Sequence, residues 1–407
     1  SGEDEDTVVE GFTITGGAYE HGAGMYIKSS SPTVTDCWFV ENTATYHAAG
    51  LDIFECQTPP TVSGCRFIDN TAVQDGGAMK VQDAKATVSD CLFEGNSSDR
   101  GGAIYTETSD IDVIDCSFIS NETGTGGGVC VLDGSGARFL NATFTMNTAG
   151  NAGGAAYLSG DSELAFVNCE FLHNEHTGGN GEAGGIYIAS AGAAKLANCT
   201  FTGNTSTQNY DAIFVHPDND IPTVLTNCIV WANGINTPIG GGGPVNITYS
   251  DLQDLLPGQG NINSDPLFVD PDDGDCHLAA GSPCIDAAFN NALPADHHDI
   301  DGDGLKCERV PIDLDGEPRF TDDPATDDTG CGLPVIVDMG VYEFAGVPAD
   351  VVYGDVDVSG TVDLDDIYGV LDDWGACDGC CLGDVNADGS VDIDDVFAVL
   401  GAWGPCP

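Results

Sequence analysis

The sequence predicts an all-β parallel β-helix, a solenoid, followed by a small C-terminal α-helical domain. A unit of 25–30 residues recurs from about residue 22 to residue 233, which is typical of solenoids. The apolar runs within the unit are short and lack helical spacing, so they favour strands. Two acidic loops end the chain, and each precedes an apolar stretch suited to an amphipathic helix.

The composition excludes several classes of partner. The 407 residues include 66 Asp and Glu but only 10 Lys and Arg, which gives a formal net charge of -56. This charge repels nucleic acids and anionic membranes, so we expect neither as a partner. Hydrophobic residues make up 41% of the chain, enough for a buried core. No apolar run is long enough for a membrane span, and no signal peptide opens the chain, so we expect a soluble, mature product from which any signal has already been removed.

Three residue types mark each repeat at constant spacing. A cysteine is followed two residues later by Phe and five residues later by Asn, with Ala142 and Val230 as exceptions in the first two columns. Neighbouring coils lie about 4.8 Å apart, so identical residues should stack into ladders. The cysteine column comprises Cys37, Cys65, Cys91, Cys116, Cys169, Cys199 and Cys228. The asparagine column comprises Asn42, Asn70, Asn96, Asn121, Asn147, Asn174, Asn204 and Asn233.

The residue before each cysteine-column position predicts a bend. It is always Asp, Asn or Gly, the residues that adopt the left-handed conformation at little cost. The bend separates a strand with inward residues such as Val34 from a strand that carries Cys and Phe. Each repeat also contains a phrase of the type Gly-Gly-Ala, and a third strand follows it, with inward residues such as Leu51 and Ile53. We therefore expect three strands per coil. The bend residues are Asp36, Gly64, Asp90, Asp115, Asn141, Asn168, Asn198 and Asn227.

One outward column of the third expected strand holds the candidates for a glycan or partner surface. Stacked aromatic rings can bind sugars or a partner chain, and cross-strand stabilisation of the sheet is the structural alternative. Asp52 and Lys80 occupy the same column on adjacent coils, as a surface ion pair or as catalytic groups. The aromatic members of the column are Tyr26, Tyr105, Tyr157, Tyr187 and Phe214.

The recurring Gly-Gly-Ala and Phe-x-x-Asn phrases resemble the repeats of polymorphic outer-membrane proteins, a family of secreted and surface-exposed right-handed β-helices. The resemblance spans about half of the chain. It implies a right-handed β-helix, which we place at residues 1–270, and a function in adhesion or surface architecture.

The coil pattern begins at about Thr7, with no amphipathic cap helix before it. An uncovered β-helix end is a template for another chain. We therefore expect head-to-tail assembly into filaments, in which the C-terminal region of one subunit docks on the next. The alternative is that the N-terminus is a processing boundary from which a cap has been removed.

Residues 271–350 form an Asp- and Pro-rich segment that we expect to cap the β-helix. Its phrases at 281–286 and 337–343 resemble the C-terminal segment of secreted β-helix proteins of the choice-of-anchor group. Within it, Asp299, Asp301 and Asp303 alternate at the spacing of an oxygen-ligated calcium loop. Val310 stands where an EF-hand requires an acid, so a structural calcium ion and a solvated acidic turn both remain open.

Residues 351–407 contain two loops that each hold a full set of calcium ligands. The loops begin 29 residues apart and precede apolar stretches at 367–374 and 396–403. They resemble a type I dockerin, a paired half-EF-hand domain, which implies two bound Ca²⁺ ions. Leu364-Asp365 and Ile393-Asp394 replace the hydroxyl pairs by which cellulosomal dockerins recognise cohesins. The predicted ligands are Asp355, Asp357, Ser359, Thr361, Asp363 and Asp366 in the first loop and Asp384, Asn386, Asp388, Ser390, Asp392 and Asp395 in the second.

Fifteen of the 17 cysteines fall into two groups. The column cysteines are best interpreted as small buried apolar residues. The others in loop-rich segments predict disulfides and hence an oxidising, extracellular setting, with connectivity left open. These are Cys276, Cys284, Cys307, Cys331, Cys377, Cys380, Cys381 and Cys406.

Taken together, these features predict an extracellular structural or adhesive surface protein, stabilised by calcium, whose partner is itself or another surface protein. The alternative is a secreted protein that binds or cleaves a polysaccharide. The basic residues of the repeats are scattered over different repeat positions, so no catalytic residue is assigned. Four histidines lie in turn regions and predict solvated side chains, namely His21, His47, His173 and His176.

Overall fold

The computed structural model describes residues 4, 6–179, 183–207, 209–254, 256–302, 309–332, 335–348, 364–372, 374–376, 385 and 390–401. The chain divides into two compact units. The first comprises residues 1–196, 201–224 and 230–246, and the second comprises residues 197–200, 225–229 and 247–407.

Strands recur at four positions along the coil. The first position holds β1 (Val8–Glu10), β5 (Thr33–Thr35), β9 (Thr61–Ser63), β13 (Lys85–Ser89), β17 (Asp110–Ile114), β21 (Gly136–Leu140), β25 (Glu163–Val167), β29 (Ala193–Ala197), β33 (Thr223–Thr226) and β36 (Val245–Thr248). The second holds β2 (Thr13–Thr15), β6 (Trp38–Val40), β10 (Arg66–Ile68), β14 (Leu92–Glu94), β18 (Ser117–Ile119), β22 (Thr143–Thr145), β26 (Glu170–Leu172), β30 (Thr200–Thr202), β34 (Ile229–Val230) and β37 (Asp251–Leu252). The third holds β3 (Ala18–His21), β7 (Thr43–His47), β11 (Thr71–Ala72), β15 (Ser97–Arg100), β19 (Glu122–Thr125), β23 (Thr148–Ala152), β27 (Glu175–His176) and β31 (Thr205–Ser206). The fourth holds β4 (Met25–Lys28), β8 (Leu51–Phe54), β12 (Met79–Gln82), β16 (Ile104–Glu107), β20 (Val129–Leu132), β24 (Ala156–Leu158), β28 (Ile186–Ile188), β32 (Tyr210–Val215) and β35 (Thr237–Gly240).

The elements beyond the coils are short. Strand β38 (Phe268–Asp270) pairs antiparallel with β39 (Asp275–Leu278), β40 (Thr321–Asp322) with β41 (Val347–Pro348), and β42 (Gly375–Ala376) with β43 (Ser390–Val391). The helical elements are the 3-10 helix η1 (Asn290–Ala292) and the α-helices α1 (Leu364–Asp372) and α2 (Ile393–Gly401).

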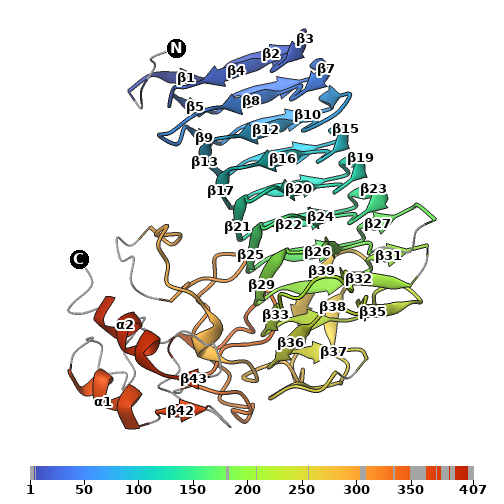
Figure 1. Ribbon diagram of the computed structural model, residues 1–407. Helices are drawn as coiled ribbons and strands as arrows, with labels where there is room; N and C mark the ends of the chain where they lie inside the picture. The colour runs from blue at the N-terminus through green and yellow to red at the C-terminus, as the bar shows by residue number, and fades with distance from the viewer. Residues whose placement is uncertain are drawn as a thin grey trace. The chain divides into compact units, whose positions relative to one another are not determined.

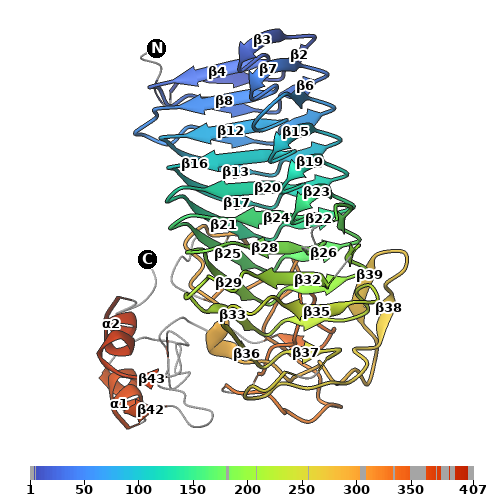
Figure 2. The same cartoon turned by 45° about the vertical axis from the view of Figure 1, so that its right-hand side comes forward.

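In the first unit, strands at the same coil position pair in parallel, with register shifts in the pairs β3–β7, β19–β23 and β32–β35. Figures 1 and 2 show these coils stacked along one axis. The expectation of three strands per coil was wrong, because the strand after each column asparagine was missed. That strand is mostly polar and carries a single small inward residue, such as Ala44 or Ala72, so no apolar run reveals it.

The bend predicted before each cysteine column position is present, with φ between 49° and 61° at all eight residues. Two further left-handed bends recur in the coils. One precedes the asparagine column, as at Glu41 and Asp69, and the other follows the fourth strand, as at Glu55 and Asp83. Glu rarely adopts this conformation, so these bends are imposed by the coil and could not be predicted from residue preference.

Two ladders fill the interior. The phenylalanines from Phe39 to Phe201 are fully buried, and neighbouring rings stack with centroids 4.3–5.0 Å apart and interplanar angles of at most 7°. The column cysteines are buried and form no disulfides, as predicted. The backbone N–H of Cys37 donates to Sγ of Cys65 at 3.4 Å. The thiol contact with Cys91 and burial raise the pKa of Cys65, which keeps that side chain a neutral thiol.

A fully buried arginine organises the cap segment, which we define as the described part of residues 271–350. Nη1 of Arg319 donates to Oε2 of Glu343 at 3.1 Å and to the carbonyl of Gly340 at 3.1 Å. Its Nη2 donates to the carbonyl of Val341 at 2.7 Å. Burying a guanidinium requires such compensation, so Arg319 holds this part of the chain in one conformation.

Within the second unit, the cap segment also binds two bend residues of the coil pattern. Nδ2 of Asn227 donates to the carbonyl of Phe289 at 2.9 Å, and the backbone N–H of Phe289 donates to Oδ1 of Asn227 at 2.7 Å. Nδ2 of Asn198 donates to the carbonyl of Asp338 at 3.1 Å. The bend column therefore has a second use in this unit, as a set of outward amide groups that bind the cap segment.

The two α-helices share a small apolar core, formed by Val370, Val385, Val391 and Val399. Each helix contains nine residues and begins three residues before the apolar stretch that predicted it. The contact between the helices buries valines, whereas larger hydrophobic side chains of both helices, such as Tyr368 and Phe397, are exposed.

Candidate functional site

The outward column of the fourth-position strands is unusually buried. Asp52 in β8 pairs with Lys80 in β12, which pairs with Tyr105 in β16, which in turn pairs with Cys130 in β20. These four residues are 4%, 5%, 1% and 0% exposed. Asp52 and Lys80 share one column, as expected, but their burial is not that of a surface ion pair.

A second column lies over the first. His47, Asp75 and Arg100 occupy the last position before the bend in three successive coils. Oδ2 of Asp75 lies 2.8 Å from Nδ1 of His47, and its Oδ1 lies 2.7 Å from Nε of Arg100. The Arg100 guanidinium is 4.9 Å from the ring centroid of Tyr105. We call the combined set the polar cluster, which comprises Asp52, Lys80, Tyr105, His47, Asp75 and Arg100.

Glycine bends bring the two columns together. Gly76 and Gly101 have φ of 61° and 63°. A Cβ at either position would lie 2.2 Å from the carbonyl oxygen of Met79 or 2.3 Å from that of Ile104. Glycine avoids this clash, so the chain turns tightly from the third strand to the fourth. The turn carries the residue before each glycine onto the outer face of the fourth-position strands.

The polar cluster displaces two carboxyl pKa values in opposite directions. Burial raises the pKa of Asp52 from 3.8 to about 6, although Lys80 and His47 oppose this shift. Burial acts on Asp75 as well, but its hydrogen bond to His47 and its pairing with Arg100 outweigh burial and lower its pKa. Two carboxyl groups of one cluster whose pKa values are displaced in opposite directions are an arrangement that acid–base catalysis uses. Buried ion-pair networks produce the same displacement.

Sequence reasoning missed this cluster. The expectation that His47 is a solvated turn residue was wrong, since its side chain is 19% exposed and pairs with Asp75. His176 is fully buried as well. His21, His47, Asp75 and Arg100 each stand directly before three small residues, Gly or Ala, so aligning the repeats on that phrase places them at one position. The distance from the cysteine column to this position varies between coils, which hid the alignment.

The aromatic part of the outward column forms a stack. The rings of Tyr157 and Tyr187 have centroids 5.2 Å apart, and those of Tyr187 and Phe214 are 4.9 Å apart, both pairs nearly parallel. Tyr105 and Tyr187 are 1% and 6% exposed, whereas Tyr26 is 48% exposed. The stacked rings cover one another's faces, which favours stabilisation of the sheet over a platform for sugar rings.

We expect Asp52 to make the stability of the first unit depend on pH. Its pKa is raised on folding, so the folded state holds a proton that the unfolded state loses as pH rises from about 4 to about 6. Over that range the wild type should lose up to about 3 kcal/mol of unfolding free energy relative to Asp52→Asn. Urea unfolding of both proteins at several pH values measures the difference. Asp110→Asn, at an exposed position, is the control, and parallel profiles for wild type and Asp52→Asn would contradict the expectation.

Most of the predicted calcium ligands near the C-terminus lie outside the described residues, namely Asp355, Asp357, Ser359, Thr361, Asp363, Asp384, Asn386 and Asp388. Asp366 and Ser390 lie in α1 and β43, but their side chains are outside the described part. Asp392 and Asp395 lie at the start of α2, where the backbone N–H of Asp392 donates to Oδ2 of Asp395 at 2.8 Å.

The acidic turn near Asp299 is organised by a different aspartate. The carboxylate of Asp296 accepts hydrogen bonds from the backbone N–H groups of His298 at 3.2 Å and Ile300 at 2.8 Å. Asp303 lies outside the described residues. Among the residues that the structure does describe, Asp299 and Asp301 belong to no group of three acidic, His or Cys side chains close enough to share a metal ion.

The loop cysteines differ in part from expectation. Cys276 and Cys284 are buried thiols that form no disulfide. Sγ of Cys284 donates instead to Oδ2 of Asp251 at 3.3 Å, so its surroundings favour a thiol. Cys331 is disulfide-bonded. Cys307, Cys377, Cys380, Cys381 and Cys406 lie outside the described residues.

Comparison with known proteins supports the fold. The family described as the right handed beta helix region matches residues 76–252. This part of the chain is a right-handed parallel β-helix. Neither the curated proteins nor the solved structures give a match to the chain. Among the described residues, no helix has the length and apolar character needed to cross a membrane.

Proposed function

We propose that this chain is an extracellular structural or adhesive surface protein. Its β-helix acts as a rigid scaffold, and its C-terminal segment is a dockerin-like module that binds two calcium ions. Another surface protein, a second copy of this chain or a surface polysaccharide is the partner.

The observation that supports a scaffold is how the chain uses its few cations. Six of the 10 Lys and Arg residues contact a side chain of an adjacent coil, by an ion pair or over an aromatic ring. A protein that binds an anionic substrate would gather such groups around a common site. Here each of the six contacts a side chain of an adjacent coil instead, although four of them remain exposed. The six residues are Lys28, Arg66, Lys80, Lys85, Arg100 and Arg138.

A polysaccharide-cleaving enzyme is the second candidate, and the polar cluster is the observation that favours it. Asp52 and Asp75 have displaced pKa values beside Lys80 and Arg100, cations of the kind that a uronic-acid polymer would require. The near-complete burial of Asp52, Lys80 and Tyr105 weighs against access by a polymer.

One experiment separates the two candidates. The full chain is incubated with cell-envelope material and with acidic and neutral polysaccharides, with calcium or with a chelator. We expect calcium-dependent retention on the envelope material and no release of reducing ends or unsaturated sugars, because the reactive groups are engaged between coils. Sugar release that Asp52→Asn and Lys80→Met abolish would replace the scaffold with the enzyme. Lys85→Met is the matched control, since Lys85 forms an exposed ion pair with Asp110 at 2.9 Å. Absence of both retention and turnover would remove both candidates.

A further inference from the structure

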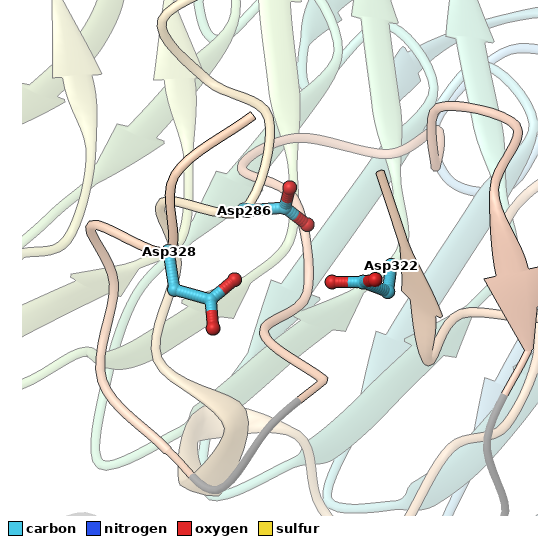
Figure 3. Close-up of side chains that lie close together, drawn as sticks. All are labelled: Asp286, Asp322 and Asp328. Atoms are coloured by element: carbon cyan, nitrogen blue, oxygen red, sulfur yellow. The ribbon is translucent and has the colours of Figure 1, made fainter. Parts of the chain in front are cut away.

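We propose that Asp286, Asp322 and Asp328 form a calcium-binding site in the cap segment. The site is separate from the two C-terminal loops and from the turn at Asp299, and it does not depend on the proposed function. Each of the three residues offers a carboxylate oxygen, and these oxygens all lie within 4.8 Å of one another. Figure 3 shows the three carboxylates turned toward a common space.

The main observation for this site is the carboxylate of Asp286, which is buried without a described side chain that donates a hydrogen bond to it. The residue is fully buried, and within the described part of the chain no side chain donates a hydrogen bond to Oδ1 or Oδ2. The backbone N–H of Asp323 is close enough to interact with the carboxylate but does not reach hydrogen-bond geometry. A buried carboxylate without hydrogen bonds is costly, whether charged or protonated. A bound cation compensates both for burial and for the two neighbouring acids.

The backbone of Asp286 is held firmly, so the side chain is aimed rather than free to turn away. Its N–H donates to Oδ1 of Asp338 at 2.7 Å, and its carbonyl accepts from the N–H groups of Thr329 at 2.9 Å and Gly330 at 3.1 Å. Asp338 is fixed in turn by Phe344, whose N–H donates to Oδ2 of Asp338 at 2.7 Å. The two conspicuous phrases of the cap segment, 281–286 and 337–343, thus meet at this point.

The other two acids come from one loop. Asp322 ends β40, and Asp328 follows six residues later. Between them the carboxylate of Asp323 accepts hydrogen bonds from Oγ1 of Thr326 at 2.8 Å and from the N–H of Ala325 at 3.1 Å. This turn folds the loop back, so that both acids reach Asp286. Asp328 is exposed, which leaves room for water molecules in the coordination shell.

The donor set selects calcium. It consists of carboxylates without imidazole or thiolate, which suits a hard cation. Ca²⁺ binds oxygen at about 2.4 Å, so two ligands on opposite sides of the ion lie about 4.8 Å apart. The three carboxylate oxygens lie within 4.8 Å of one another, so they can all reach one Ca²⁺ ion. Mg²⁺ usually keeps several waters and binds only one or two carboxylates, so a set of three carboxylates favours Ca²⁺.

Calcium titration of the full chain tests the site. All variants are made in a background with Asp355→Ala and Asp384→Ala, which remove the first ligand of each C-terminal loop. We expect Asp286→Asn to bind one calcium ion fewer per chain than the background, by calorimetry and by metal analysis. The midpoint should lie at about 10⁻⁴–10⁻³ M, the range of extracellular modules. Asp327→Asn is the matched control, because Asp327 is an exposed acid in the same loop and should leave the stoichiometry unchanged.

Thermal unfolding distinguishes loss of the calcium site from misfolding of the variant. In chelator, Asp286→Asn should unfold at the same temperature as the background or higher, because it removes a buried charge beside two acids. With calcium, the background should gain stability and Asp286→Asn should gain less. Equal calcium stoichiometry and equal calcium-induced shifts in both proteins would overturn the proposal. A response of the background to magnesium but not to calcium would overturn the choice of ion. Neither outcome bears on envelope retention or polysaccharide turnover, so this site and the proposed function fail independently.

Discussion

Asn121→Ala is expected to lower the unfolding free energy of the first unit by at least about 4 kcal/mol. Asn121 is fully buried, and its side chain makes four hydrogen bonds. Nδ2 donates to the carbonyl of Phe93 at 3.0 Å and to Oδ1 of Asn147 at 2.9 Å. Oδ1 accepts from the backbone N–H and from Nδ2 of Asn96, both at 3.0 Å.

The cost arises from the partners that the substitution leaves behind. Alanine would leave the Asn96 backbone N–H inside the coil without its acceptor, and it would remove one hydrogen bond from the Phe93 carbonyl and from each neighbouring amide. A buried polar group without a partner costs roughly 1–3 kcal/mol. Urea unfolding, followed by circular dichroism of the β-helix, measures the loss. Asn151→Ala, at an exposed position, is the control, with an expected change below about 0.5 kcal/mol. A loss for Asn121→Ala as small as that of the control would show that the ladder does not stabilise the coil.

Phe118→Ala is expected to cost about 4–5 kcal/mol. The Phe118 ring is fully buried and stacks between Phe93 at 4.9 Å and Phe144 at 4.6 Å, with interplanar angles of 4° and 3°. It also meets the edge of Phe139 at 6.0 Å. Alanine would remove the ring from the middle of the ladder, and paired strands above and below prevent the coil from closing the space.

Phe118→Leu separates ring stacking from volume. Leucine fills much of the space, so the expected loss is smaller, about 1–2 kcal/mol. Ile235→Ala is the control, because Ile235 is fully exposed, and it should change stability by less than about 0.5 kcal/mol. The same urea experiment applies to all three. Equal losses for Phe118→Ala and Phe118→Leu would mean that aromatic stacking, rather than cavity formation, dominates the effect.

The repeat pattern was sufficient to predict the coil and its ladders. Cysteine, phenylalanine and asparagine recur at constant spacing. The residue before each cysteine-column position is always Asp, Asn or Gly, which indicates a left-handed bend because these residues adopt that conformation at little cost. These columns can be recognised in the sequence because each side chain packs against the same position of the next coil. The same packing contact therefore selects the same residue type once in every repeat.

The polar cluster and the three cap aspartates were not predictable in the same way. Asp75 was one acid among 66 until the glycine bend brought it between His47 and Arg100. Asp286 and Asp328 are 42 residues apart in a stretch with many acids, and no spacing rule connects them. Their proximity depends on hydrogen bonds through Asp338, Thr329 and Gly330, which become visible only when the chain is folded.

A periodic sequence thus specifies a periodic core, because inward side chains interact chiefly with the same position one coil away. Which outward side chains become buried, and which acids meet, depends on turn geometry and on contacts between distant segments. The left-handed turns at Ala48, Gly76 and Gly101 decide the first of these. The second depends on the backbone hydrogen bonds that hold Asp286 within reach of Asp322 and Asp328.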